Sequence, residues 1–412
     1  MCSGAIYLLL SPEAQETDME TLFLKKGEER RLRAGHLWVF SNEVDVRRSP
    51  LSAFEPGQDA LVADAQGHVL GTAYVNPASL ITARLVSREK RPLDAGLLRE
   101  RLMQALSLRE RLFERPFYRL CHGEGDFLPG LVLDRHGDWL TAQITTAGME
   151  RHREELAQIL EDILKPRGCV LANDIASRDL EGLPRREECL WGDRADVPAE
   201  SEIEENGLKY RIPLTGGQKT GWFYDQRPNR AALAALARGA DVLDAFCYVG
   251  GFGALAAARG AKSVTFLDAS ASALEFARGN AARAGLDRTD ALKGDALTLL
   301  ADLRREGRRF DIVCLDPPAF IKRRKDAKQG LEAYRRVNEL GLDLVRPGGL
   351  LMSCSCSHHL EASELLRLAA RAAGRRGRHL RLLFQGFQGP DHPIHPSMPE
   401  TAYLKTFLFQ AD

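Results

Sequence analysis

The chain has 412 residues, more than a single hydrophobic core usually organises, so we expect two or three domains. Hydrophobic residues make up 44% and charged residues 28%, as in a globular protein, and a net charge of +0 excludes attraction of nucleic acid through the overall field. The sequence has neither an apolar run near the roughly 20 residues of a membrane span nor a basic signal-peptide start, so we expect a cytoplasmic protein.

The first 91 residues divide into two parts. Residues 1–19 carry no partner pattern and are expected to be a disordered extension. Residues 20–91 contain short apolar stretches separated by turns, which predict a small β-barrel or sandwich. These stretches are Leu37–Phe40, Ala60–Ala63, Val69–Val75 and Ile81–Val86.

Basic residues crowd one end of this β-rich region. They are Lys25, Lys26, Arg30, Arg31 and Arg33. Two interpretations stay open, because such a cluster can be either a solvated face or a patch that contacts nucleic-acid phosphates.

Residues 92–198 mix helical and strand patterns and predict a compact central α+β domain. Leucines at helical spacing predict helices over Leu97–Glu114 and Glu150–Leu164. Two strands around the turn at His136 and Gly137 predict a hairpin. We find no catalytic constellation in this part of the sequence.

Residues 199–412 alternate strand and helix, which predicts a mostly parallel sheet of the α/β, Rossmann-like class with an antiparallel last strand. The expected strands are Asp241–Ala245, Ser263–Asp268, Phe310–Asp316, Gly349–Ser355, His379–Phe384 and Tyr403–Leu408. The expected helices are Gly253–Arg259, Ala271–Ala284, Leu331–Val345 and Ala362–Ala373. Ligands of such sheets bind at the carboxyl ends of the strands, so residues that follow strands are the candidates for a site.

A glycine-rich turn follows the first of these strands. Asp244 lies in the strand, and the turn that follows carries Phe246, Gly250, Gly251 and Gly253. Glycines let the backbone approach a ligand closely. NAD folds also use a glycine turn, but a carboxylate beside it would repel a pyrophosphate, whereas it can orient the ammonium group of S-adenosylmethionine (SAM). The pattern therefore favours SAM as the cofactor.

Two further acids fit the same cofactor. Asp268 ends the next strand, where a carboxylate can accept hydrogen bonds from both ribose hydroxyls. Asp295 follows the third strand and can accept a hydrogen bond from the adenine amine, although either acid can instead be a helix N-cap. The polar and aromatic segment 217–230 is expected to close over the cofactor through Asp225, Gln226 and Arg227.

A rigid turn with a carboxylate follows the strand that ends near Asp316. Pro317 and Pro318 fix the backbone and remove two donors, so their carbonyls can face the amine of a bound base, with Asp316 beside them. Lys322 and Arg323 come directly after this turn. They are either part of a solvated loop or contacts to RNA phosphates.

A cysteine pair, Cys354 and Cys356, ends the next strand. Carbon C5 of a pyrimidine is a poor nucleophile, and its methylation requires prior addition of a thiolate at C6, whereas nitrogen methylation needs no thiol. We expect a nucleophilic cysteine here to be partly exposed, next to the Asp316 turn, with a pKa that favours the thiolate. The alternative is that both cysteines are buried fillers. A lone C-x-C pair is a weak zinc signal, so we expect no metal site.

Several motifs occur together and in one order. They are Arg33-Ala-Gly-His-Leu-Trp-Val-Phe-Ser41, Gly123-Glu-Gly-Asp-Phe-Leu-Pro-Gly-Leu-Val-Leu-Asp134, Lys219-Thr-Gly-Trp-Phe-Tyr-Asp-Gln-Arg227, Phe246-Cys-Tyr-Val-Gly-Gly-Phe252, Asp316-Pro-Pro318, Ser355-Cys-Ser357, Asp391-His-Pro393 and Tyr403-Leu-Lys405. With them, the chain from about residue 20 resembles the RlmI-type family of bacterial 23S ribosomal RNA (cytosine-C5)-methyltransferases.

This resemblance implies an RNA-binding PUA barrel over 20–91, a central α+β domain over 92–198 and a class I SAM-dependent methyltransferase domain over 199–412. It also implies that Cys356, selected by its spacing from Gly348 and Gly349, is the nucleophile. The chain has Ala319 where other RNA cytosine-C5 methyltransferases carry a second cysteine, so another base must release the product, and Asp316 is the candidate.

The sequence therefore predicts an enzyme that uses SAM to methylate C5 of a cytosine in large-subunit ribosomal RNA. One alternative is a guanine or adenine N-methyltransferase on the same scaffold, which would not need Cys356. Another is a non-catalytic RNA-binding assembly factor. The expected partner is ribosomal RNA, with no membrane, and the oligomeric state is left open with a homodimer as one option.

Overall fold

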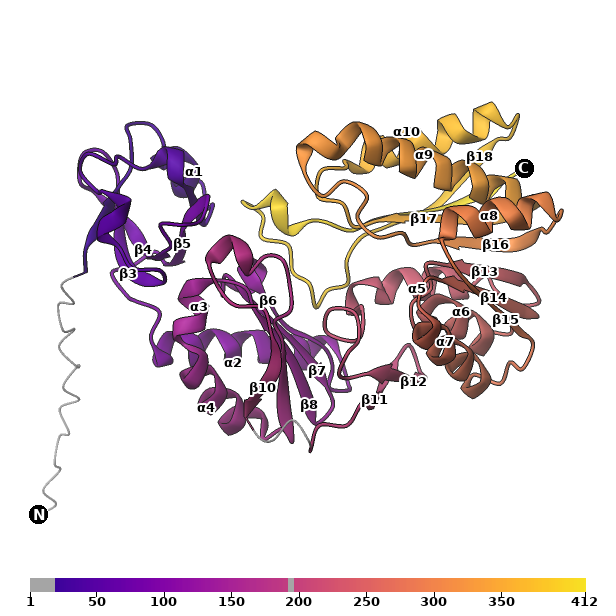
Figure 1. Ribbon diagram of the computed structural model, residues 1–412, viewed down its shortest axis with the longest axis horizontal. Coiled ribbons are helices and arrows are strands. Elements are labelled where there is room, and N and C mark those ends of the chain that lie inside the picture. The colour runs from indigo at the N-terminus through magenta and orange to yellow at the C-terminus, as the bar shows by residue number, and fades with distance from the viewer. Residues whose placement is uncertain (1–18, 192–195) are drawn as a thin grey trace, which may run out of the picture.

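A computed structural model describes residues 19–191 and 196–412, so the expected extension over residues 1–19 lies almost entirely outside the described residues. Three larger sheets follow one another along the chain, and Figure 1 shows them from left to right. We call the regions around them the N-terminal, central and C-terminal domains. Along the described residues, no helix has the length and apolar character that crossing a bilayer requires.

The N-terminal domain is a five-stranded sheet in the order β1-β3-β4-β5-β2. Its elements are β1 (Thr21–Phe23), α1 (Glu29–Arg33), β2 (Trp38–Phe40), β3 (Gln58–Ala63), β4 (Val69–Val75) and β5 (Ile81–Ser87). A bridge between Leu24 and Val44 joins the two edges of the sheet, which closes it into the small barrel that the sequence predicts.

The central domain is a five-stranded sheet in the order β10-β9-β8-β7-β6, packed against helices. Its elements are α2 (Ala95–Leu112), β6 (Phe117–His122), β7 (Leu131–His136), β8 (Trp139–Ile144), α3 (Ala147–Arg151), α4 (Arg153–Leu164), β9 (Gly168–Ala172) and β10 (Glu187–Trp191). The hairpin around His136 and Gly137 is confirmed. The single helix expected over Glu150–Leu164 is instead two helices that meet at His152.

The C-terminal domain contains a seven-stranded sheet in the order β15-β14-β13-β16-β17-β19-β18, in which β19 is antiparallel to both neighbours. Its elements are β11 (Glu200–Glu205), β12 (Leu208–Pro213), α5 (Arg227–Ala234), β13 (Asp241–Ala245), α6 (Gly251–Ala258), β14 (Ser263–Asp268), α7 (Ala271–Arg283), β15 (Thr289–Lys293), α8 (Ala296–Arg305), β16 (Phe310–Leu315), α9 (Ala327–Leu344), β17 (Val345–Ser355), α10 (Ala362–Arg375), β18 (Leu380–Gly386) and β19 (Lys405–Ala411). The α/β architecture expected from the sequence is confirmed.

Side chains on the buried strands alternate between two cores. On β13, Val242 packs with α6 and α7, while its neighbour Leu243 packs with α8 and α9 on the opposite face. Helices therefore cover both faces of the sheet, and a ligand can reach the sheet only at the ends of its strands.

The segment between β18 and β19, residues 387–404, leaves its own domain and reaches the N-terminal barrel (Figure 1). We call it the strap. Met398 of the strap is fully buried in the core of the N-terminal domain. The hydroxyl of Ser397 donates to the carbonyl of Ala34 at 2.8 Å, and Arg109 of the central domain donates to the carbonyl of Asp391 at 2.8 Å. The strap thus contacts all three domains.

Replacing Met398 with alanine should destabilise the N-terminal domain. A buried Met→Ala change removes apolar contacts and leaves a cavity, which costs about 2–5 kcal/mol. Hydrogen exchange of the β3 and β4 amides should report this loss as faster opening. The control is Met103→Ala on α2, where the side chain is 46% exposed and a change within about 0.5 kcal/mol is expected. Unchanged exchange in Met398→Ala would show that the barrel is complete without the strap.

Candidate active site

The carboxyl ends of four neighbouring parallel strands meet at one edge of the C-terminal sheet. Strand β13 pairs in parallel with β14 and β16, and β16 pairs in parallel with β17. This register brings together the glycine turn, Asp268, Asp316 and Cys356, which the sequence assigns to one site.

The glycine turn wraps around Asp244. The amide of Gly253 donates to Oδ2 of this fully buried carboxylate at 2.8 Å, while Oδ1 is buried without a hydrogen-bond partner among the described residues. Phe246 (φ 63°) adopts a left-handed conformation that non-glycine residues rarely adopt outside functional sites. Position 250 (φ 80°) requires glycine, because a Cβ atom there would lie 2.8 Å from Cα of Ala277.

Burial, with a smaller contribution from the carboxylates of Asp316 and Asp268, raises the pKa of Asp244 to about 7. A buried acid with one unsatisfied oxygen is stabilised by a cation placed beside it. SAM carries a sulfonium and an ammonium group, so the residues present here fit that cofactor. Gly251 and Gly253, in the first turn of α6, are both buried in this wall of the site.

The two other acids of the expected cofactor site differ in their surroundings. Asp268 accepts from the amides of Tyr248 and Ser270, both at 2.9 Å, and so holds the glycine turn; each oxygen retains lone-pair capacity for ribose hydroxyls. Asp295 is exposed and caps α8, where the amide and hydroxyl of Thr298 both donate to its Oδ1.

The three side chains expected to close over the cofactor point in different directions. Asp225 is buried and accepts a hydrogen bond from Tyr403 at 2.6 Å, and Gln226 donates to Asp316 at 2.9 Å. Both therefore lie at the Asp316 turn. The guanidinium of Arg227 instead donates to the carbonyl of Phe117 in the central domain, so this side chain joins two domains.

The Asp-Pro-Pro turn presents a protonatable acid. Burial raises the pKa of Asp316 to about 7, and the nearby carboxylate of Asp225 raises it as well. Pro317 is buried and Pro318 is exposed. Lys322 and Arg323 are both exposed on the loop that follows.

The two cysteines differ in accessibility. Cys354 is fully buried in the sheet core and accepts from the hydroxyl of Thr406, so it is a core residue. Cys356 lies just beyond β17 and is half-buried, as a nucleophile requires. The expectation of a low thiol pKa is wrong for the protein without ligands. Burial raises the pKa of Cys356, Asp316 and Asp225 raise it too, and Lys219 opposes them.

Hydrogen bonds on both sides fix the position of Cys356. The hydroxyl of Tyr334 lies 2.8 Å from the hydroxyls of both Ser355 and Ser357, and the amide of Ile321 donates to the latter at 3.2 Å. Lys405 donates to the carbonyl of Ser357 at 2.6 Å. The roles of Tyr334, Ile321 and Lys405 were not predicted from the sequence, although Lys405 lies within the motif Tyr403-Leu-Lys405.

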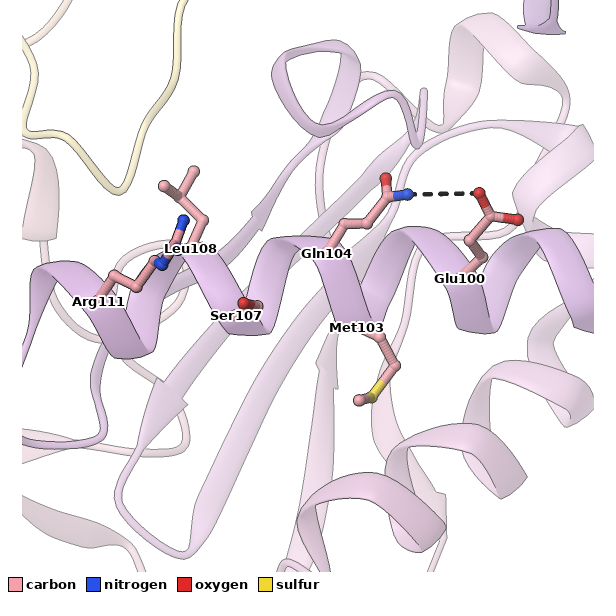
Figure 2. A pocket seen from close by; sticks show the side chains of 6 residues that line it. All are labelled: Glu100, Met103, Gln104, Ser107, Leu108 and Arg111. Carbon is pink, nitrogen blue, oxygen red and sulfur yellow. Dashed lines mark hydrogen bonds between the residues drawn. The ribbon is translucent and has the colours of Figure 1, made fainter.

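A separate depression lies on the outer face of α2 in the central domain. Figure 2 shows that it is lined by side chains at helical spacing: Glu100, Met103, Gln104, Ser107, Leu108 and Arg111. Since all six come from one helix, and none is a residue of the Asp316 or glycine turns, this depression is not the candidate active site.

Comparison with known proteins defines the class. Residues 118–410 match a family of S-adenosylmethionine-dependent methyltransferases, and residues 22–88 match the PUA-like domain family. The fold resembles a SAM-dependent methyltransferase from Streptococcus mutans with a TM-score of 0.80 at 22% identity, covering 95% of this chain and all of that one. A solved methyltransferase complexed with SAH gives a TM-score of 0.81 with the same identity and coverage. The protein is a SAM-dependent methyltransferase with a PUA-like domain.

Curated relatives narrow the family further. The chain is 36% identical over 362 residues to ribosomal RNA large subunit methyltransferase I of Tolumonas auensis, covering 86% of this chain and 89% of the relative. It is 35% identical over 395 residues to the protein of the same name from Vibrio cholerae, covering 94% and 98%. The chain belongs to the ribosomal RNA large subunit methyltransferase I family.

Affinity for SAM should depend on pH through Asp244. Below a pKa of about 7 this acid is protonated in the free protein, so binding a cation must release the proton. The affinity should therefore rise by up to about tenfold per pH unit towards pH 7 and level off above it. Calorimetry from pH 5.5 to 8.5 would measure this rise. Asp244→Asn should flatten it, whereas Asp316→Asn should retain it. Equal wild-type affinity at pH 5.5 and 8 would contradict the role of Asp244.

Proposed function

We propose that this enzyme methylates C5 of a cytosine in large-subunit ribosomal RNA. The observation that carries the proposal is the half-buried thiol of Cys356 beside the Asp316 turn, with Cys354 confined to the core. The printed names of the relatives support the RNA substrate, and the PUA-like domain supports RNA binding. Since ribosomal RNA is the substrate, the bacterial cytoplasm is the proposed location.

The proposed chemistry divides into addition, transfer and elimination. The thiolate of Cys356 forms a bond to C6, and the electron pair released from the C5–C6 double bond makes C5 nucleophilic. SAM would supply an electrophilic methyl group: the electron pair at C5 forms the new C–C bond as the bond from the methyl carbon to the sulfonium breaks, which leaves S-adenosylhomocysteine. A base then removes the C5 proton, the double bond re-forms and the C6–S bond breaks. Asp316, with its pKa near 7, is the proposed base.

We assign recognition of the RNA to groups around this centre. Pro317, Pro318 and Asp316 would face the base, and exposed Lys322 and Arg323 would contact phosphates. A target cytosine that is base-paired within an RNA helix would have to be flipped out of that helix to reach the thiol. In the basic cluster of the N-terminal domain, Arg31 and Arg33 form ion pairs with Glu43 and Asp64, each at 2.7 Å, so these two arginines already have partners within the protein.

We propose that Asp244, Phe246, the glycines of the turn, Asp268 and Asp295 bind SAM. Asp225 and Gln226 would lie between the bound SAM and the target base. The three proposed domains keep the boundaries 20–91, 92–198 and 199–412.

Methylation of a guanine or adenine nitrogen is the second candidate. The raised pKa of Cys356 favours it, because a protonated thiol does not attack C6 and nitrogen methylation needs only the Asp316 turn.

The two cysteines provide a direct test. Cys356→Ala should lower methyl transfer to large-subunit RNA by at least about 1,000-fold and leave SAM binding intact, because the nucleophile is part of the reacting centre. Cys354→Ala removes only a buried sulfur, should cost about 1 kcal/mol of stability and should keep most of the activity. The measurements are transfer of labelled methyl groups and mass mapping of 5-methylcytosine. Full activity of Cys356→Ala with a methylated purine nitrogen would establish the second candidate.

We also propose that two copies pair through β18. This strand is the edge of the seven-stranded sheet, and it carries Leu382 and Leu383, which are 45% and 50% exposed. An apolar edge strand is a template for pairing with another chain. Light scattering should give twice the monomer mass of 45.7 kDa, and Leu383→Glu should give the monomer. A wild-type monomer at micromolar concentration would exclude this dimer.

A further inference from the structure

Lys405 bonds to the residue that follows Cys356, and the charge of a second lysine, Lys219, also acts on the thiol. Lys405 is the first residue of β19 and pairs in register with Ser355 of β17. Its ammonium donates to the carbonyl of Ser357 at 2.6 Å and to the carbonyl of Tyr403 at 2.8 Å. Lys219 approaches from the segment before α5, and its ammonium lies 4.9 Å from the centre of the Phe223 ring.

The surroundings of the thiol create a need for positive charge. Cys356 is half-buried, and the carboxylates of Asp316 and Asp225 face it. Burial and negative neighbours both disfavour the thiolate, which is the form that can attack carbon. A nucleophile at this position therefore requires cations close by.

We propose that Lys405 prepares Cys356 for attack: its ammonium fixes the loop that carries the thiol and places a positive charge beside it, and Lys219 adds to that charge. This inference rests on the proposed role of Cys356 as the nucleophile. Both lysines are then positioning residues, because they act through the cysteine.

The geometry of Lys405 suits the fixing role. An ammonium group has three N–H donors, and two of them bond to the carbonyls of Ser357 and Tyr403, on different segments of the chain. One carbonyl belongs to the residue directly after Cys356, so movement of the thiol is coupled to the lysine. Burial lowers the pKa of Lys405, while Cys356 and Glu361 raise it, as expected for an ammonium beside a thiolate.

Lys219 adds positive charge from a second segment, where its backbone is left-handed, with φ at 50°. Of the charges around the thiol, Lys219 contributes most to lowering the pKa of Cys356. The same ammonium lowers the pKa of Asp225, so it is shared between the thiol and the neighbouring acid.

Other titratable groups face the thiol or the lysines and are uncharged near pH 7. Burial raises the pKa of Tyr334, Tyr403 and Cys354, and burial together with Lys405 lowers the pKa of His358. The charge balance at Cys356 is therefore set by the two lysines against Asp316 and Asp225.

The test measures the thiol directly, without RNA. The rate at which iodoacetamide alkylates Cys356 is followed from pH 6.5 to 9.5 by mass spectrometry of the peptide that carries it. Lys219→Met should lower the rate at pH 7.5 about tenfold, as expected for a thiol pKa raised by one unit. Lys405→Met should lower it similarly, and Lys405→Arg should recover it to within about threefold. The control is Lys209→Met, whose side chain is 65% exposed on β12 and whose loss should change nothing.

The outcomes separate this inference from the proposed function. Alkylation profiles of Lys219→Met and Lys405→Met that match the wild type overturn the inference, even if Cys356→Ala abolishes methylation. Shifted profiles together with an active Cys356→Ala also overturn it, because the prepared thiol would then have no part in catalysis. If Lys405→Met has no melting transition, Lys219→Met and Lys405→Arg decide the result.

Discussion

The hydrogen bond from Tyr403 to Asp225 joins the two segments that complete the site. Tyr403 lies near the end of the strap, and Asp225 lies in the segment that precedes α5. The adjacent Gln226 reaches Asp316, and the carbonyl of Tyr403 accepts from Lys405. One buried contact thus fixes the distance between the groups assigned to the base and those assigned to the nucleophile.

Two buried acids lie close together at the centre of this edge. Asp244 and Asp316 end adjacent parallel strands, and burial raises the pKa of both to about 7. Two neutral acids cost less to bury than two carboxylates, so the protein can form this site before any ligand arrives. A cationic cofactor would favour ionisation instead, because it stabilises the carboxylate form of the acid beside it. Cofactor binding and the protonation of the acids near the reacting base are therefore linked.

Much of this arrangement was predictable because it is local in sequence. The strands over Asp241–Ala245 and Ser263–Asp268 were predicted with their observed bounds, since buried parallel strands are continuous apolar runs that end in turns. The glycine turn and the Asp316 turn follow from such strands. The choice of Cys356 over Cys354 came from the resemblance, and burial of the latter supports it.

The features that could not be predicted depend on contacts between residues far apart in the sequence. Arg227 was expected at the cofactor but reaches the central domain. This contact could not be predicted, because the partner carbonyl lies 110 residues earlier in the chain. The pKa of Cys356 depends on four side chains, Lys219, Asp225, Asp316 and Lys405, which come from three distant segments. Tyr334 lies within an amphipathic helix, where an aromatic residue gives no sign that its hydroxyl bonds to two serines.

The strap also sets the order in which the protein is completed during synthesis. The barrel strands end at Ser87, yet their core includes Met398. At a synthesis rate of about 5–20 residues per second, the ribosome needs on the order of 15–60 s to add the roughly 300 residues in between. Until then the apolar side chains that surround Met398 in the barrel core lack this contact. The first domain to be translated therefore cannot complete its core until almost the whole chain has been made, shortly before β19 completes the C-terminal sheet.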